Sequence, residues 1–171
     1  MGGRAAHDPG ANPREHQRIL GDLIEFLRPR LRETRRGTLA VGINVFREWG
    51  AALDYRIPDL TFVAAGREHV LRDDGVRGGG PDAVIEIRSP EDETYEKVPF
   101  YAALAVKEVI VCQRGSKVPE IFRLGRSLAL QADRDGWLDS TALGVRFRCV
   151  VDAPPRLRVE DASDPAISVE I

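Results

Sequence analysis

Three ionisable residues stand where two apolar segments of the sequence could bring them together. Asp59 directly follows Pro58 at the start of one segment, and Glu86 and Arg88 lie inside the other, VIEIRSP. Since side chains alternate along a strand, Glu86 and Arg88 project from one face, and Asp59 can face them from a neighbouring strand. Two close carboxylates repel unless they share a cation, and Mg²⁺ with its bound waters suits that role. One such water could attack a phosphodiester while a basic side chain stabilises the growing charge.

A purely structural interpretation of the same residues stays open. Val84, Glu86 and Arg88 could form the solvent-facing side of a half-buried antiparallel strand whose other side faces the core. Asp59 would then be a capping or turn residue after proline. The pattern alone slightly favours this second interpretation.

The first element that must position these residues is an amphipathic helix. Asn12 can cap it, Pro13 suits its first position, and Glu15 completes a pattern resembling a capping box. Its apolar residues recur three and four apart, at Ile19, Leu20, Leu23, Ile24, Leu27 and Leu31. We expect Pro29 to kink or shorten this helix.

Strands rich in β-branched residues follow the helix. Three neighbouring antiparallel strands are expected at residues 38–49, 59–64 and 82–88. Asn44 could line the site or be an edge-strand polar group, and Asp54 is expected in a loop.

A short helix is expected next, within residues 91–105. Because proline is harmless only near a helix start, Pro99 indicates that the helix begins between Thr94 and Val98, with Lys97 in its first turn. The apolar segment 108–113 then returns to the sheet, which completes one β-α-β crossover.

The remaining pattern sets the fold class and the boundaries of the domain. Further short strands are expected at 118–124, 127–132 and 145–151. We expect a mixed α/β or α+β domain over residues 12–152, a flexible N-terminal arm over 1–11, and a proline-rich, weakly ordered tail over 153–171.

Composition limits the classes of function. The 171 residues carry a net charge of −2, so any contact with nucleic acid must be local rather than a property of the whole surface. Arg35 and Arg36 close an arginine-rich run that could meet phosphates or form a solvated helix end. The two cysteines, Cys112 and Cys149, are expected as buried thiols, and the scattered histidines exclude zinc-protease spacing. No apolar stretch predicts a membrane span, so we expect a cytoplasmic protein.

The motifs also resemble a known family. Pro58-Asp59 followed by Glu86-Ile87-Arg88 resembles the signature of the PD-(D/E)XK nuclease superfamily. The run EIRSPEDETYEKVPFYAALAVKEVIVCQ, residues 86–113, is similar to the Uma-type family of bacterial restriction-endonuclease-like proteins. In that family a Glu in a strand is followed by Ser-Pro, then by a Lys, a Tyr four residues later and a Val-rich strand. The likeness covers most of residues 16–150.

The resemblance implies a restriction-endonuclease-like fold, a central mixed β-sheet flanked by helices. It implies that Asp59, Glu86 and the backbone carbonyl of Ile87 ligate Mg²⁺, or Mn²⁺ in its place. Arg88 stands where the superfamily has Lys, and since Arg keeps its charge it can stabilise negative charge but cannot shuttle protons. Lys97 could supply the basic group instead, or it could be an exposed lysine.

Two further residues and the partners follow from the same resemblance. His16 and Tyr101 would be auxiliary residues, although a helix-surface histidine and a packing tyrosine are the simpler interpretations. The implied activity is Mg²⁺-dependent hydrolysis of DNA by a homodimer with no membrane partner. The alternative is a catalytically impaired nuclease-like fold that only binds DNA or protein.

Overall fold

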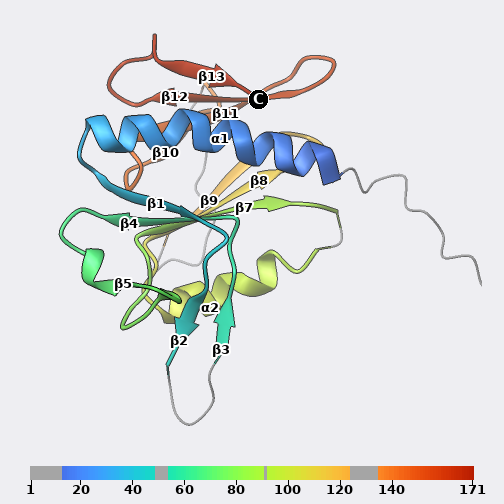
Figure 1. Cartoon of the computed structure of the whole chain (residues 1–171). Helices are drawn as coiled ribbons and strands as arrows, with labels where there is room; N and C mark the ends of the chain where they lie inside the picture. The colour runs from blue at the N-terminus through green and yellow to red at the C-terminus, as the bar shows by residue number, and fades with distance from the viewer. Residues whose placement is uncertain (1–12, 49–53, 91, 124–134) are drawn as a thin grey trace, which may run out of the picture.

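The computed structural model describes residues 13–48, 54–90, 92–123 and 135–171 (Figure 1). Five strands form its central sheet in the order β1-β4-β7-β8-β9. They are β1 (Gly37–Val41), β4 (Leu60–Ala64), β7 (Ala83–Arg88), β8 (Glu108–Gln113) and β9 (Pro119–Arg123). β7 and β8 are parallel and the other neighbours are antiparallel, which confirms the expected mixed sheet and the antiparallel β1-β4-β7 unit.

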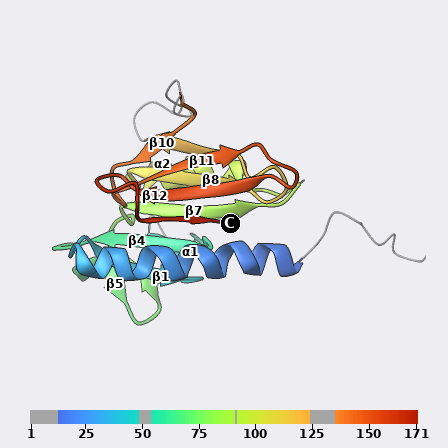
Figure 2. The same cartoon turned by 90° about the horizontal axis from the view of Figure 1, so that it is seen from above.

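Both faces of this sheet are covered, which explains the near-continuous apolar sequences of β7 and β8. Helix α1 (Pro13–Glu33) lies along one face and buries its apolar stripe there (Figures 1 and 2). The helix runs through Pro29 to Glu33, so the proline does not shorten it.

A second, four-stranded sheet shares the core on the α1 side, in the order β10-β11-β12-β13. Its strands are β10 (Leu138–Ser140), β11 (Val145–Val150), β12 (Arg156–Asp161) and β13 (Ser168–Glu170). The expectation of a weakly ordered tail over 153–171 was therefore wrong, because β12 pairs with both β11 and β13 and buries Leu157 and Val159.

The opposite face of the central sheet is covered by a short helix and a small sheet. Helix α2 (Val98–Ala103) follows the 3-10 turn η2 (Tyr95–Lys97), which confirms the late helix start and the β-α-β crossover to β8. The small sheet has the order β3-β2-β6-β5. Its strands are β2 (Val45–Arg47), β3 (Asp54–Arg56), β5 (Leu71–Arg72) and β6 (Gly75–Val76), with the 3-10 turn η1 (Glu68–Val70) before β5.

Two local expectations need correction here. Residues 38–49 do not form one strand, because the chain turns at Gly42, whose φ is 57°, and passes from the central sheet to the small one. Asp54 begins strand β3 rather than lying in a loop, and Asn44 donates to the carbonyl of Asp74.

Other expectations fall partly outside the described residues. The N-terminal arm, Asn12 and the strand at 127–132 lie outside them. Both cysteines are free, and Cys112 is buried as expected, whereas Cys149 is only half-buried. No helix among the described residues is long and apolar enough to cross a membrane.

Candidate active site

Asp59 lies at the point where strand β4 stops pairing with β7. The last paired residues are Leu60 and Ile85, and continuing the antiparallel register by one residue sets Asp59 opposite Glu86. Its Oδ2 accepts the backbone N–H of Ile87 at 2.7 Å. Strand β7 continues beyond its pairing with β4, so the N–H of Ile87 has no partner on β4, and the Asp59 carboxylate accepts it instead.

His16 reaches this carboxylate from the first turns of α1. Its Nε2 lies 3.0 Å from Asp59 Oδ1, and both side chains are about three-quarters buried, at 24% and 22% exposure. The simpler interpretation of His16 as a helix-surface residue was wrong. α1 places it at the sheet end because the helix packs its buried stripe across β1 and β7.

Glu86 is buried on the α2 side of β7, with only 3% of the residue exposed. Its Oε1 accepts the Tyr101 hydroxyl at 2.7 Å, and its Oε2 accepts Lys97 Nζ at 3.0 Å. The interpretation of Glu86 on a solvent-facing strand side was wrong, because α2 and the small sheet cover that side. Tyr101 is likewise fully buried, and Lys97 is bound to a carboxylate rather than extended into solvent.

The electrostatics of Glu86 follow from this environment. Burial raises the pKa of Glu86, the charge of Lys97 and the Tyr101 hydroxyl counteract the rise, and the Asp59 carboxylate adds to it. Burial and the neighbouring Glu86 carboxylate also raise the pKa of Tyr101 well above its usual range. Tyr101 is thus a hydrogen-bond donor at any ordinary pH, and Asp59 acts on Glu86 as a nearby like charge.

The donor set fits a hard cation only in a limited way. Among the described residues, no three His, Cys, Asp or Glu side chains gather as a metal site. A cation would need the two carboxylates, a backbone oxygen and waters, which is a ligand set that Mg²⁺ accepts. In a strand the N–H and C=O of one residue point to the same side, so the Ile87 carbonyl faces the side of Asp59.

Arg88 points to a different set of partners. Its guanidinium donates to Gln113 Oε1 at 3.2 Å, lies 3.8 Å from Asp92 Oδ1, and stacks 4.7 Å from the centre of the Tyr95 ring. Of the two basic candidates, Lys97 contacts the carboxylate of Glu86.

The two arginines expected to bind DNA lie elsewhere. Arg35 and Arg36 follow the C-terminal end of α1, whereas His16 lies in its first turns. At ~1.5 Å rise per residue, the 21-residue helix separates its two ends by about 30 Å. Arg36 donates to the carbonyl of Thr141 at 3.2 Å, so the structure does not bring this pair to Asp59 and Glu86.

Sequence reasoning missed a second ionic group beside the site. Lys117 is buried in the turn after β8, where its Nζ contacts Glu15 and donates to the Arg114 carbonyl at 2.7 Å. Hydrogen bonds from Arg18 and Lys117 lower the pKa of Glu15 to about 2. Glu15 was expected as a helix cap, but its carboxylate instead ties α1 to this turn. No local motif predicts this ion pair, because 102 positions separate the two residues in the sequence.

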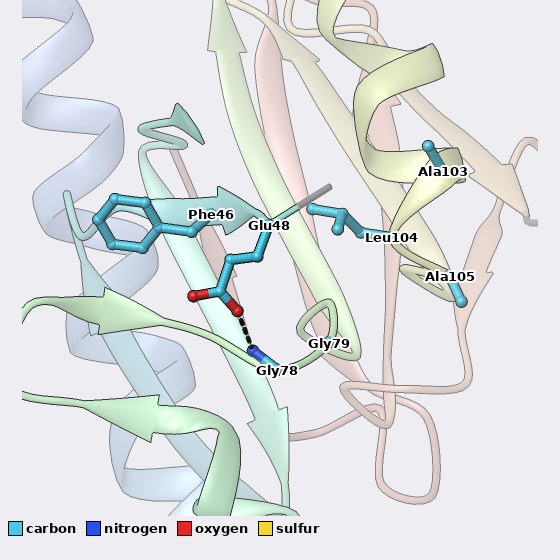
Figure 3. A pocket seen from close by; sticks show the side chains of 7 residues that line it. All are labelled: Phe46, Glu48, Gly78, Gly79, Ala103, Leu104 and Ala105. Atoms are coloured by element: carbon cyan, nitrogen blue, oxygen red, sulfur yellow. Dashed lines mark hydrogen bonds between the residues drawn. The ribbon is translucent and has the colours of Figure 1, made fainter. Parts of the chain in front are cut away.

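A pocket of about 350 Å³ lies at the far end of α2 (Figure 3). Strand β2 contributes Phe46, the chain beyond it Glu48, and the end of the helix Leu104; Glu48 accepts the N–H of Gly78 at 3.1 Å. None of the predicted site residues lines this pocket.

Comparison with known proteins agrees with the resemblance to nucleases that the motifs suggested. No curated protein matches the chain. A solved structure from Anabaena variabilis, titled a putative nuclease belonging to DUF820, is similar with a TM-score of 0.60 and 12% sequence identity, over 75% of this chain and 73% of that one. This likeness shows a shared fold and is consistent with the expected restriction-endonuclease-like architecture.

The family model of Uma2, described as "Putative restriction endonuclease", matches residues 3–152. The match includes α1 with His16, the Asp59 and Glu86 strands, and Lys97 and Tyr101 before and within α2. Since it spans most of the 171 residues, the chain belongs to the Uma2 family.

Proposed function

We propose that this chain is a Mg²⁺-dependent endonuclease that hydrolyses phosphodiester bonds of DNA. One arrangement carries the proposal: Asp59, just before β4, accepts the N–H of Ile87 beside Glu86 on β7, and Lys97 is bonded to Glu86. A buried carboxylate that lies near a second one is expensive to maintain for stability alone. The family to which the chain belongs supports the assignment to nucleases.

Asp59, Glu86 and the Ile87 carbonyl would hold the cation, with Mn²⁺ as a possible substitute. A bound Mg²⁺ supplies an activated water and polarises the phosphate. The protein itself orients Asp59 through His16 and the Ile87 N–H, and it orients Glu86 through the Tyr101 hydroxyl. These contacts hold the two carboxylates in place and would fix which of their lone pairs remain for a cation.

Lys97 is the basic group that we assign to the reaction. Its ammonium lies 3.0 Å from Glu86 Oε2 and a quarter of its side chain is exposed, so it can contact both the carboxylate and an incoming phosphate. There it would stabilise the charge that develops on the phosphate oxygens. Arg88, which stacks on Tyr95 and contacts Gln113 and Asp92 rather than Glu86, would stabilise the phosphate charge from a greater distance.

Plasmid nicking with the purified protein tests the proposal. We expect cleavage with Mg²⁺ and none with EDTA, and at least a 100-fold loss in Asp59→Asn, Glu86→Gln and Lys97→Met. Glu25→Gln, on the exposed side of α1, is the matched carboxylate control and should keep full activity. Cleavage that survives both Asp59→Asn and Glu86→Gln would exclude these residues from the mechanism.

A second candidate function, binding of DNA or protein without cleavage, is favoured by a different observation. Every oxygen of the two carboxylates already accepts a protein donor, and the residue in the usual Lys position, Arg88, is engaged with Tyr95 and Gln113. DNA binding that needs neither a divalent cation nor Glu86, with no cutting under any metal, would favour this function.

We also propose a homodimer, because cutting both strands of a duplex commonly uses two sites related by symmetry. Multi-angle light scattering at micromolar concentration should give about twice the 18.9 kDa mass of the chain. A monomer under these conditions would contradict the dimer without affecting the assignment of the site.

A further inference from the structure

The antiparallel strands β2 and β3 hold two arginines beside the candidate site. Arg47 on β2 and Arg56 on β3 place their guanidinium carbons 5.2 and 4.8 Å from the centre of one ring, that of Phe100 in α2. Phe100 in turn stands edge-on to Tyr101, with ring centres 5.6 Å apart, and the Tyr101 hydroxyl binds Glu86. A continuous series of contacts therefore joins the arginines to the buried carboxylate.

The two arginines share one counter-charge. Asp54 accepts Arg47 Nη2 through Oδ2 and Arg56 Nη1 through Oδ1, each at 2.6 Å. The hydrogen bond from Arg56 lowers the pKa of Asp54, so that carboxylate stays ionised at neutral pH. By formal charge, these three residues together carry one net positive charge.

The group is accessible and preorganised. The Arg47 and Arg56 side chains are 34% and 39% exposed, and their strands β2 and β3 lie next to α2 (Figure 1). A guanidinium stacked on a ring and held by a carboxylate loses little conformational freedom when it binds a phosphate. Arg56, the last residue of β3, also precedes Asp59 by only three residues, so it lies close in the chain to the candidate site.

We propose that Arg47 and Arg56 bind backbone phosphates of duplex DNA next to the bond to be cut, and that Phe100 and Asp54 orient them. This inference rests on the proposed function and names the surface through which the substrate would reach the site. It also replaces Arg35 and Arg36, at the far end of α1, as the expected DNA contacts. An overall charge of −2 is compatible with such a local contact.

Fluorescence anisotropy with a labelled 20-base-pair duplex tests the inference, with Ca²⁺ in place of Mg²⁺ to prevent cutting. Arg47→Gln and Arg56→Gln should each weaken binding about fivefold or more and lower the salt slope, log K against log[salt], by about 0.9 per lost phosphate contact. The double variant should lower it by about twice as much. Arg56→Lys should retain most of the salt slope, because it keeps the charge.

Arg72→Gln is the matched control, since Arg72 is an exposed arginine on β5 at the opposite edge of the same small sheet. Unchanged affinity and salt slope in the Arg47→Gln/Arg56→Gln protein would overturn the inference, as would equal effects of Arg72→Gln. A wild-type protein that binds through these arginines but never cuts would contradict the endonuclease and leave the binding surface standing. An RNA duplex that binds equally well would show that the two arginines recognise backbone phosphates in general, which would contradict the assignment of DNA as the specific substrate.

Discussion

At the scale of single residues, the site depends on a buried carboxylate that is held by two donors from one short segment. Lys97 and Tyr101 lie four residues apart, at the start of α2 and within it, so their side chains emerge from the same side of the turn. Each donor offsets part of the cost of burying Glu86, and neither alone would satisfy both of its oxygens.

The Tyr101→Phe substitution separates these contributions through pH. Because the pKa of Glu86 is already raised, loss of the hydroxyl raises it further and destabilises the ionised form. Below the ordinary value of 4.5, the carboxyl is protonated in folded and unfolded chains alike, so this part of the loss disappears. Urea unfolding should show a loss of about 1–3 kcal/mol at pH 8 and a smaller loss at pH 4.

Tyr55→Phe is the control for this substitution, because Tyr55 is 48% exposed. Loss of its hydroxyl should change the free energy of unfolding by less than about 0.5 kcal/mol. A loss in Tyr101→Phe of the same size at both pH values would mean that the hydroxyl does not act on the ionised carboxylate.

The sequence could indicate some of these residues and not others, for a physical reason. Asp59, Glu86, Lys97 and Tyr101 carry local signals, a residue after proline, alternation along a strand and a spacing of four. The burial of Glu86 depends on the small sheet, which no local pattern around Glu86 predicts. The ion pair of Glu15 with Lys117 joins distant segments, so only the folded chain reveals it.

At the scale of elements, predictions succeeded where apolar residues recur in a clear helix or strand pattern, including the strands expected at 118–124 and 145–151, which are β9 and β11. They failed where prolines precede a strand or a glycine divides one. α1, β4, β7 and β8 each bury several apolar side chains in an unbroken pattern. Strand β12 does alternate, with Leu157 and Val159 buried and Arg156 and Arg158 at the alternate positions, but the preceding prolines obscured that signal. Gly42 shows the opposite case, where one turn residue divides an apparently continuous strand.

The seating of α2 gives a prediction at this scale. The N–H of Gly80 donates to the Leu104 carbonyl at 3.0 Å, and a Cβ on Gly80 would lie 2.4 Å from that same oxygen. Gly80→Ala should therefore push the end of α2 from the sheet and lower stability by about 1–3 kcal/mol, with reduced cleavage because Lys97 and Tyr101 move with the helix.

Gly21→Ala provides the contrasting variant for the same thermal unfolding series. Gly21 lies inside α1, and a Cβ there would meet no atom within 4 Å. Alanine should raise stability by about 0.5–1 kcal/mol, because it restricts the unfolded chain more than glycine does. A stable, fully active Gly80→Ala protein would show that α2 tolerates displacement.

At the scale of the whole molecule, the candidate site is built on one sheet that needs cover on both faces. α1 and the β10-β13 sheet share one hydrophobic cluster on the His16 side, while α2 and the small sheet form a second cluster on the Glu86 side. Asp59, just before β4, is contacted by His16 on the first side, and it accepts the N–H of Ile87, the residue after Glu86, which is buried on the second side. The geometry of the site therefore depends on both covers.

Removal of residues 153–171 tests this dependence, since the Uma2 match ends at residue 152 although the fold does not. The deletion strips Leu157, Val159 and Ile171 from the core, where each is at most 2% exposed. At ~1.5–3 kcal/mol per buried side chain, the loss of about 5–9 kcal/mol approaches the whole stability of a typical domain. The shortened chain should therefore show no cooperative thermal transition.

Point variants of the same region give a graded test. Leu157→Ala alone should lower the free energy of unfolding by about 2–5 kcal/mol, whereas Val151→Ala, at 88% exposure, should leave it unchanged. An unchanged melting temperature after the deletion would mean that α1 alone covers that face of the sheet.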